Sequence, residues 1–257
     1  MIKLTMQLAQ RGFSLIELAI VLFIVTLLMG GLLPTISAQI DQQRTTETRK
    51  QLDDIQQALI GYAIINGRLP CPASTNTNGI ENPIGGGTCV NPYDGFVPAA
   101  TLGISTGVDS QGNAGFAVDS WNNRIRYAVT QSNSKAFTTP NYMSTYFSTL
   151  APDLQVCSTA TGITGAGTAS ASCQASKSLT TGVPAVIYST GKNGGYGGTG
   201  TDEKENPNPN STATSDRLFI SQSPTPSTAA NGEFDDIVIW ISPNILINRM
   251  ISAGKLP

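Results

Sequence analysis

The apolar stretch over residues 13–33 constrains this chain more than any other part of its sequence. Only Ser14, Glu17 and Thr26 interrupt it. A helix of roughly 21 residues can cross a hydrocarbon core of about 30 Å. The sequence therefore predicts a transmembrane helix over residues 13–34, preceded by a short polar leader over residues 1–12 that carries Lys3 and Arg11.

The position of the small-residue junction separates this leader from an ordinary secretory signal. A secretory signal has a shorter apolar core and a cleavage site on its far side. Here the junction between Gly12 and Phe13 lies before the apolar residues. Cleavage at this point would release the leader and keep the apolar helix.

The residues around this junction resemble the class III signal of type IV pilins and type II secretion pseudopilins. The matching residues 11–17 are Arg-Gly-Phe-Ser-Leu-Ile-Glu. They combine the junction with an acid at Glu17, and they open a long apolar helix whose first stretch ends at Pro34. The resemblance implies that a prepilin peptidase cleaves after Gly12 and methylates the new N-terminus at Phe13. It also implies a single-pass protein of the inner membrane with a periplasmic or extracellular head. An assembly platform in that membrane would then combine it with other pilin or pseudopilin subunits into a filament.

Glu17 is the residue of this stretch that most needs an explanation, because an acid costs about 2.5–3.5 kcal/mol near the centre of a membrane helix. One interpretation is a capping box with Ser14, in which both residues satisfy free N–H groups of the first turn. The other follows from the resemblance, in which the acid pairs with the N-terminal amine of a neighbouring subunit. We favour the pair.

Beyond Pro34 the helical pattern becomes amphipathic over residues 35–67. Leu52, Ile55 and Leu59 form an apolar stripe that Tyr62 continues. Asn66-Gly67 is a typical helix end with glycine at C′. We expect one helix over residues 13–66, about 80 Å long at 1.5 Å per residue, weakened or kinked near residues 30–34. A plain membrane anchor followed by a separate helix is the alternative.

The composition of the 257-residue chain narrows its function. The net charge is −2 without a basic tract, which argues against nucleic-acid binding. The chain has no histidine, so it has neither a histidine-based triad nor a histidine-ligated metal. No paired-acid motif indicates catalysis, and we expect a protein that is not an enzyme.

Four cysteines lie beyond the apolar stretch, which favours two disulfides in an exported domain. Three pairings are possible. We favour the two that close local loops, each contributing about 3 kcal/mol. These pairs are Cys71 with Cys89 and Cys157 with Cys173. The absence of C-x-x-C and histidine disfavours zinc.

Residues 68–257, here called the head, are predicted to form an antiparallel sheet on the second half of the helix, which makes the fold class α+β. Alternation in residues 124–130 places Ile125, Tyr127 and Val129 on one face. Further strands are expected near residues 116–119, 183–190, 217–221 and 234–242, with short helices near 142–150 and 244–253. Residues 80–95 and 201–216 are predicted to be surface loops, as is the stretch between Cys157 and Cys173.

The C-terminal part resembles, over shorter motifs, the major pseudopilin of type II secretion. The matching residues are Asp119, Trp121, Asn122, Asn123 and Tyr127, then Ser189, Gly191, Asn193 and Gly194, then Asp236 and Trp240. Asn122 replaces a glycine of that pattern and Asn193 an acid. The resemblance implies calcium in the glycine-rich loop, and calcium prefers six to eight oxygen ligands. The candidate ligands are Ser189, Asn193, Asp202 and Asp235, with Glu203 as a further one; the alternative is a plain loop whose carboxylates face water.

Together these patterns predict a structural subunit of a type II secretion pseudopilus or a type IV pilus. The head is long for a repeating subunit, which favours a minor or tip component. The alternative function is a membrane-tethered periplasmic binding or catalytic domain that uses a pilin-like anchor.

Substituting Glu17 separates its two possible roles. Gln also completes a capping box but carries no charge. We therefore expect Glu17→Gln to leave the protein inserted and folded, and to abolish its assembly into fibres. Recovery of the variant in sheared fibres at the wild-type level would remove the pairing role.

Overall fold

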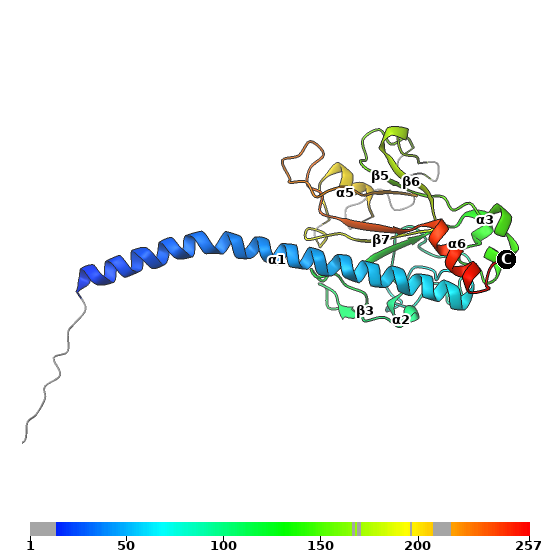
Figure 1. Cartoon of the computed structure of the whole chain (residues 1–257), viewed down its shortest axis with the longest axis horizontal. Helices are drawn as coiled ribbons and strands as arrows, with labels where there is room; N and C mark the ends of the chain where they lie inside the picture. Colours follow the sequence, from blue (N-terminus) through cyan, green and yellow to red (C-terminus); the bar gives the residue numbers. More distant parts are fainter. Residues whose placement is uncertain (1–13, 166–167, 169–170, 196, 208–216) are drawn as a thin grey trace, which may run out of the picture. The chain divides into compact units, whose positions relative to one another are not determined.

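The computed structural model describes residues 14–165, 168, 171–195, 197–207 and 217–257. The side chains of residues 29–36 are not among the described ones. The chain divides into two compact units, Met1–Arg44 and Thr45–Pro257. Helix α1 (Leu15–Asn66) contributes to both (Figure 1).

Helix α1 is 52 residues long and confirms the prediction of a single helix from residue 15 to its C-terminal end. The helix includes Gly30, Gly31 and Pro34. It ends where the sequence indicates: Gly67 has φ +68°, and its N–H donates to the Ala63 carbonyl at 2.8 Å. Glycine adopts this left-handed conformation without a Cβ penalty.

The second unit is built on the apolar stripe of α1. Leu52, Ile55 and Leu59 are buried, and so is Ala63 one turn later. They share one core with residues of the facing sheet, which are Tyr127, Val129, Ile187 and Ile241, and with Ile125 just before strand β4 (Arg126–Val129). Fully burying each large aliphatic side chain stabilises a fold by about 1.5–3 kcal/mol, so this stripe joins the helix firmly to the sheet.

The main sheet is antiparallel and has the order β1-β4-β7-β9 (Figure 1). Its strands are β1 (Gly95–Phe96), β4 (Arg126–Val129), β7 (Ala185–Ser189) and β9 (Ile237–Ile241). The register pairs Tyr127 with Ile187 and Val186 with Trp240. The α+β class and the antiparallel sheet predicted from the sequence are therefore confirmed.

A second sheet, of order β6-β5-β8, was not predicted. It consists of β5 (Leu154–Cys157), β6 (Ser178–Val183) and β8 (Leu218–Ile220), and β5 pairs with β8 in parallel. The strand predicted over residues 183–190 is divided by Pro184: Val183 ends β6, whereas Ala185 begins β7 of the main sheet. A smaller pair joins β2 (Gly107–Val108) to β3 (Ala114–Phe116).

The remaining elements are short. They are α2 (Ala99–Leu102), α3 (Ser132–Lys135), α4 (Tyr142–Thr145), η1 (Phe147–Thr149), η2 (Ala175–Lys177), α5 (Thr201–Glu205) and α6 (Pro243–Ser252). Helix α6 packs Leu246 and Met250 into the same core as the stripe of α1. Ser242 holds its N-cap position without a side-chain cap bond.

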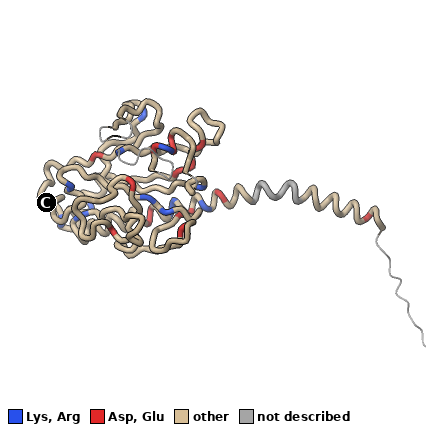
Figure 2. The backbone as a smooth tube through the Cα atoms, turned by 180° about the vertical axis from the view of Figure 1, so that it is seen from behind, with Lys and Arg blue, Asp and Glu red and all other residues tan. Residues whose placement is uncertain are grey.

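The prediction of an exposed loop over residues 201–216 is wrong in its first part. Residues 201–205 form α5, and Asp202, Glu203 and Glu205 are buried. Charged residues of the described chain gather in the second unit (Figure 2). Residues 208–216 lie outside the described residues. The prediction of a surface loop over residues 80–95 holds only in part. Ile84 is exposed as expected, but Glu81 is buried.

The two disulfides are Cys71–Cys89 and Cys157–Cys173, with S–S distances of 2.00 and 1.98 Å. These are the pairings that the sequence favoured. Each closes a local loop, so each restricts the unfolded chain as expected for a cross-link of this span.

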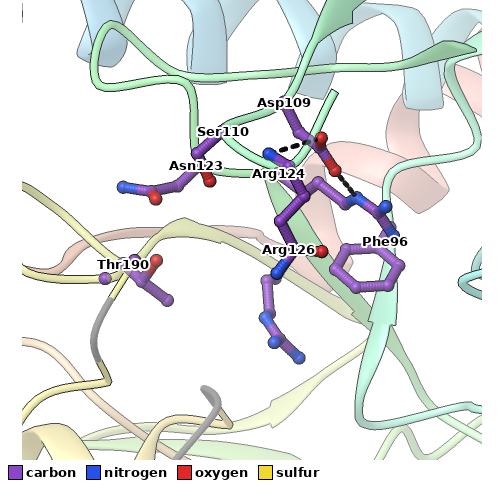
Figure 3. Close-up of a pocket in the computed structure, with 10 residues that line it drawn as sticks. Phe96, Asp109, Ser110, Asn123, Arg124, Arg126 and Thr190 are labelled. Carbon is purple, nitrogen blue, oxygen red and sulfur yellow. Dashed lines mark hydrogen bonds and ion pairs between the residues drawn. The ribbon is translucent and has the colours of Figure 1, made fainter. Parts of the chain in front are cut away.

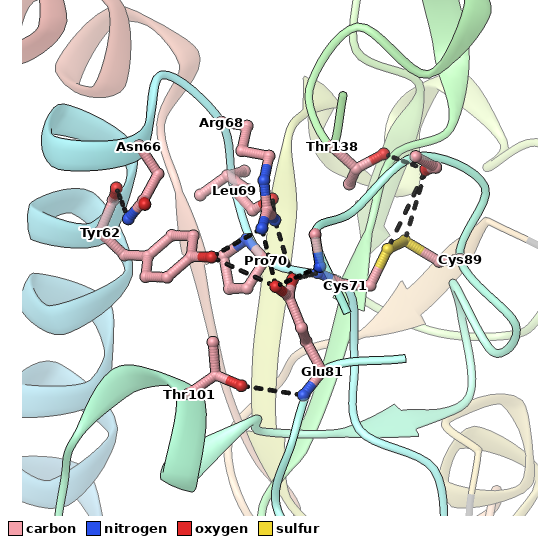
Figure 4. A network of polar contacts seen from close by, with 12 residues as sticks. Tyr62, Asn66, Arg68, Leu69, Pro70, Cys71, Glu81, Cys89, Thr101 and Thr138 are labelled. Carbon is pink, nitrogen blue, oxygen red and sulfur yellow. Dashed lines mark hydrogen bonds and ion pairs between the residues drawn. A yellow bond between two sulfur atoms is a disulfide. The ribbon is translucent and has the colours of Figure 1, made fainter. Parts of the chain in front are cut away.

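A buried ion pair joins the end of α1 to the first disulfide loop (Figure 4). The Arg68 guanidinium donates to both carboxylate oxygens of Glu81, at 2.7 and 2.8 Å. Glu81 also accepts from the N–H groups of Cys71 and Gly85, both at 3.1 Å. Burial alone would raise the pKa of Glu81, but the hydrogen bonds and charge of Arg68 hold it below its usual value.

Removing one partner of this pair leaves an uncompensated buried charge, which typically costs about 3–5 kcal/mol. We expect Glu81→Ala to lower the free energy of unfolding by about this amount in denaturant titration. Asp94→Ala is the control, because Asp94 pairs with Arg126 at 28% exposure and a more exposed pair contributes about 1 kcal/mol or less. Equal losses in the two variants would contradict the role of the Arg68–Glu81 pair.

Candidate functional site

The first candidate site lies at the start of α1. The Ser14 N–H donates to Glu17 Oε2 at 2.9 Å, and the Glu17 N–H donates to Ser14 Oγ at 3.3 Å. This is the reciprocal geometry of a capping box. Glu17 Oε1 has no hydrogen-bond partner among the described residues, and Glu17 is exposed. The cap therefore uses one carboxylate oxygen and leaves the other accessible.

The apolar side chains that follow are exposed. Their exposed fractions range from 40% for Val25 to 89% for Leu15. No charged residue occurs over residues 18–40. A contiguous apolar surface of this kind marks an interaction with another protein or with lipid.

Some sequence predictions fall outside what the structure describes. Gly12 and Phe13 lie outside the described residues, and Pro34 lies within α1 but its side chain is not described. Among the residues that the structure describes, no helix is both long and apolar enough to span a membrane.

The second candidate site is a carboxylate cluster in the head. Glu203 comes from α5, whereas Asp235 and Asp236 directly precede β9. One oxygen from each of these three residues lies within 4.8 Å of the others. Asn193 of the glycine-rich loop donates through Nδ2 to Glu203 Oε1 at 2.9 Å. Its backbone N–H and that of Lys192 donate to Asp235 Oδ2, at 3.1 and 2.8 Å.

Glycines allow the loop to approach these carboxylates closely. A Cβ at Gly191, which has φ +63°, would lie 2.3 Å from Asp235 Oδ1. A Cβ at Gly198 would lie 1.9 Å from Glu203 Oε2. Side chains at these positions would displace the acids, which explains why the loop is rich in glycine here.

The electrostatics of the cluster favour a cation. Burial raises the pKa of Asp235 to about 7, and the nearby Glu203 carboxylate adds to this rise although backbone N–H groups oppose it. Burial also raises the pKa of Asp236 well above its usual value. Acidic groups brought together with little solvent are costly in the ionised form unless a positive charge balances them.

The geometry fits calcium. Asn193 Oδ1 and Asp235 Oδ1 are buried without a hydrogen-bond partner among the described residues. Calcium binds oxygens at 2.3–2.6 Å, so its ligand oxygens lie at most about 5 Å apart, and one oxygen from each of the three acids lies within 4.8 Å of the others. Carboxylate and amide oxygens are the ligands that this ion prefers.

Two of the predicted calcium ligands lie in other networks. Ser189 donates to Asp119 Oδ2 at 2.5 Å. Asp202 accepts four hydrogen bonds, from Thr159, Ala160, Gln222 and Asn231. The structure thus brings together Asn193, Asp235 and Glu203, whereas the side chains of Ser189 and Asp202 are held by other partners. It adds Asp236, which the sequence had signalled only as part of a pseudopilin-like motif.

The other residues of that motif connect the Trp121 turn to the glycine-rich loop. Asp119 Oδ1 accepts from the N–H groups of Trp121 and Asn123, at 2.9 and 2.8 Å. Asn122, which replaces a glycine of the pattern, has φ +64°, a conformation that asparagine tolerates better than most residues. Asn123 donates to the Gly191 carbonyl at 2.7 Å. The turn therefore supports the loop that carries Asn193.

Comparison with known proteins found a match at the N-terminal end of the chain, around the start of α1. Residues 8–33 match the family model described as the prokaryotic N-terminal methylation motif. The chain carries the class III prepilin signal of type IV pilins and pseudopilins. No curated protein and no solved structure matches the chain. The long N-terminal helix packed on an antiparallel sheet is pilin-like.

The pilin-like head also contains a small polar pocket of about 90 Å³ beside the glycine-rich loop (Figure 3). Arg124 stacks on Phe116 and Phe96, with its guanidinium carbon 4.0 and 5.0 Å from the ring centroids, and donates to Asp109 at 2.6 Å. Burial alone would raise the pKa of Asp109, but hydrogen bonds from Asn113 and Arg124 lower this pKa to about 2. Arg126 pairs with Asp94. Because both arginines are paired, we assign this pocket a structural role.

Proposed function

We propose that this chain is a structural subunit of a type II secretion pseudopilus or a type IV pilus. The observation that carries the proposal is the methylation motif joined to a helix whose apolar side chains are exposed between residues 15 and 28. Such a helix needs lipid before assembly and other helices after it.

The proposed sequence of events begins with insertion of residues 13–34 in the inner membrane, with the leader on the cytoplasmic side. A prepilin peptidase cleaves after Gly12 and methylates Phe13. An assembly platform then moves the subunit into a fibre, where α1 packs beside the helices of other pilin or pseudopilin subunits. The head remains on the periplasmic or extracellular side throughout.

Glu17 is suited to guide this assembly. Its Oε2 is held by the Ser14 N–H, while Oε1 is accessible to a donor from outside the chain. In surroundings of low dielectric constant, a carboxylate and an ammonium attract each other more strongly than in water. The capping box and the intersubunit pair are therefore compatible: the first orients the carboxylate that the second uses.

The position in the fibre is the finer part of the proposal. The long head, with its second sheet and two disulfides, favours a minor subunit present in few copies. The rival function is a tethered binding or catalytic domain. A tethered domain would not need Glu17 and would not enter fibres with other pilins.

Processing of the leader tests the proposal directly. We expect the protein from cells with an active prepilin peptidase to begin at Phe13 and to carry one N-terminal methyl group, as measured by intact mass. Gly12→Val should accumulate as full-length precursor because a bulky side chain occupies the cleavage junction, whereas Gln10→Ala should be processed normally. Wild-type protein that still begins at Met1 would refute the proposal.

We further propose that Asn193, Glu203, Asp235 and Asp236 hold a calcium ion. The observation that favours it is the cluster of three carboxylates beside Asn193, whose Nδ2 donates to Glu203 and whose Oδ1 is buried without a partner among the described residues. The ion would neutralise the acids and fasten the glycine-rich loop to α5 and to the start of β9.

Thermal unfolding of the purified protein tests the calcium site. Calcium at about 100 times its dissociation constant stabilises a folded protein by about 2.7 kcal/mol, so we expect a higher melting temperature at pH 8 than in chelator. Asp235→Asn should remove most of this gain, whereas Asp53→Asn, at an exposed position, should keep it. No shift of wild-type protein at millimolar calcium and pH 8 would refute the site.

The pKa of Asp235 also predicts a pH dependence. Because this pKa is about 7 in the folded protein and about 4 in an unfolded chain, the folded state retains a proton that the unfolded state loses. In chelator the free energy of unfolding should therefore fall as the pH rises from about 4 to about 7. The gain from calcium should be smaller at pH 5 than at pH 8, because protons compete with the ion.

A further inference from the structure

Helix α5 carries Glu203 of the proposed calcium site, but its own sequence gives it little to hold it in place. The helix is only five residues long, and its N-cap residue Gly200 supplies no side-chain cap bond (Figure 1). Isolated helices shorter than about 12–15 residues are marginal in water. Contacts with the rest of the head must therefore fix the position of α5.

Asp202, the residue before Glu203, supplies such contacts and is 1% exposed. Its Oδ1 accepts from Thr159 Oγ1 at 2.9 Å and from the Ala160 N–H at 2.6 Å. Its Oδ2 accepts from Gln222 Nε2 at 2.9 Å and from Asn231 Nδ2 at 3.0 Å. A carboxylate has about four acceptor positions, so these donors use them all. Asp202 is therefore suited to hold α5 in place and not to bind an ion.

The donors come from three segments that are distant in the sequence. Two lie in the second disulfide loop (residues 157–173), one follows β8, and Asn231 lies four residues before Asp235. Asn231 also joins these segments, because its Nδ2 donates to Thr159 Oγ1 at 3.0 Å and its carbonyl accepts from the Thr201 N–H at 2.7 Å. The network thus ties α5 both to the second disulfide loop and to the segment that leads to β9.

The second disulfide loop also shares an apolar core with the segment that carries the acids. Cys157 and Ala171 of the loop are buried in one cluster with Phe234, which directly precedes Asp235. Residues of β8 complete this cluster. The loop is therefore packed and hydrogen-bonded to the two segments that supply the carboxylates of the site.

Neighbouring residues of an α-helix point about 100° apart, which allows the two adjacent acids different roles. Asp202 faces the donors of the second disulfide loop, whereas Glu203 Oε1 accepts from Asn193 Nδ2 at 2.9 Å and from the Asp235 N–H at 3.1 Å. We propose that Asp202 is a positioning residue for the calcium site, and that it holds α5 on the second disulfide loop so that Glu203 faces the ion. This inference rests on the proposed calcium site and adds that Thr159, a residue of the loop, sets its affinity.

Substitution of Thr159 tests the inference without changing the charge near the ion, which a substitution of Asp202 would do. We expect Thr159→Val, which removes the hydroxyl at nearly constant volume, to raise the calcium dissociation constant about tenfold or more, as is typical when a partner of a ligand is lost. Thr159→Ser keeps the hydroxyl and should stay within about twofold of wild type. The measurement is isothermal titration of the purified full-length protein with calcium at pH 8.

Glu81→Gln is the control for a general loss of stability, because Glu81 is a buried acceptor of the separate Arg68 network. This variant should unfold more easily in chelator but bind calcium within about twofold of wild type. Wild-type affinity in Thr159→Val would overturn the inference and leave the calcium site standing. An equal loss of affinity in Glu81→Gln would also overturn it, since the effect would then follow stability alone. If the wild-type protein binds no calcium, the proposed site fails, and the inference fails with it.

Removal of each disulfide gives a second readout. Cys157→Ser combined with Cys173→Ser should weaken calcium binding in the same direction as Thr159→Val, because the loop that carries Thr159 is no longer closed. Cys71→Ser combined with Cys89→Ser opens the other loop and should leave the affinity within about twofold of wild type. The opposite order of the two effects would contradict the inference, and the Thr159 variants decide the question if either cysteine variant fails to fold.

Discussion

The exposed apolar surface of α1 is the constraint on which the rest of this protein depends. Leu15 to Leu28 present large aliphatic and aromatic side chains that are far from buried. At about 25 cal/mol for each Å² of apolar surface removed from water, covering this surface is strongly favourable. Glu17 is the one acid within this apolar stretch. A carboxylate in such surroundings requires a cationic partner or a position at the boundary between lipid and water. The capping box with Ser14 supplies a fixed orientation, and a neighbouring amine would supply the charge.

The second unit is built to hold a head on the same helix. One stripe of α1 is buried against the main sheet, and the Arg68–Glu81 pair connects the end of the helix to a loop that the first disulfide closes. Further from the helix, the glycine-rich loop, α5 and the start of β9 bring together three acids that oppose one another unless a cation or protons balance them. The head thus combines an attachment to α1 with a charged site at the start of β9.

The sequence predicted those elements whose signal is local and repeated. Periodicity identified α1 and its stripe, Asn66-Gly67 identified its end, and alternation identified the inward face of β4. It missed the second sheet, because β5 and β8 are short and pair in parallel across about 60 residues, and no local pattern encodes such a pairing. It placed residues 201–205 in water because they are acidic, whereas Asp202 finds four donors inside the head. The calcium ligands remain a prediction for the same reason: loop composition indicates available oxygens, but only the backbone path decides which of them lie close together.

The central claim is that α1 becomes packed in a fibre, beside the helices of other subunits. The most direct measurement is the location of the mature protein after fibres are sheared from cells and separated from membranes by sedimentation. The account predicts that the processed chain appears in the fibre fraction together with other pilins or pseudopilins. Processed chain that remains entirely in the membrane fraction, while the cells shed fibres without it, would contradict the account.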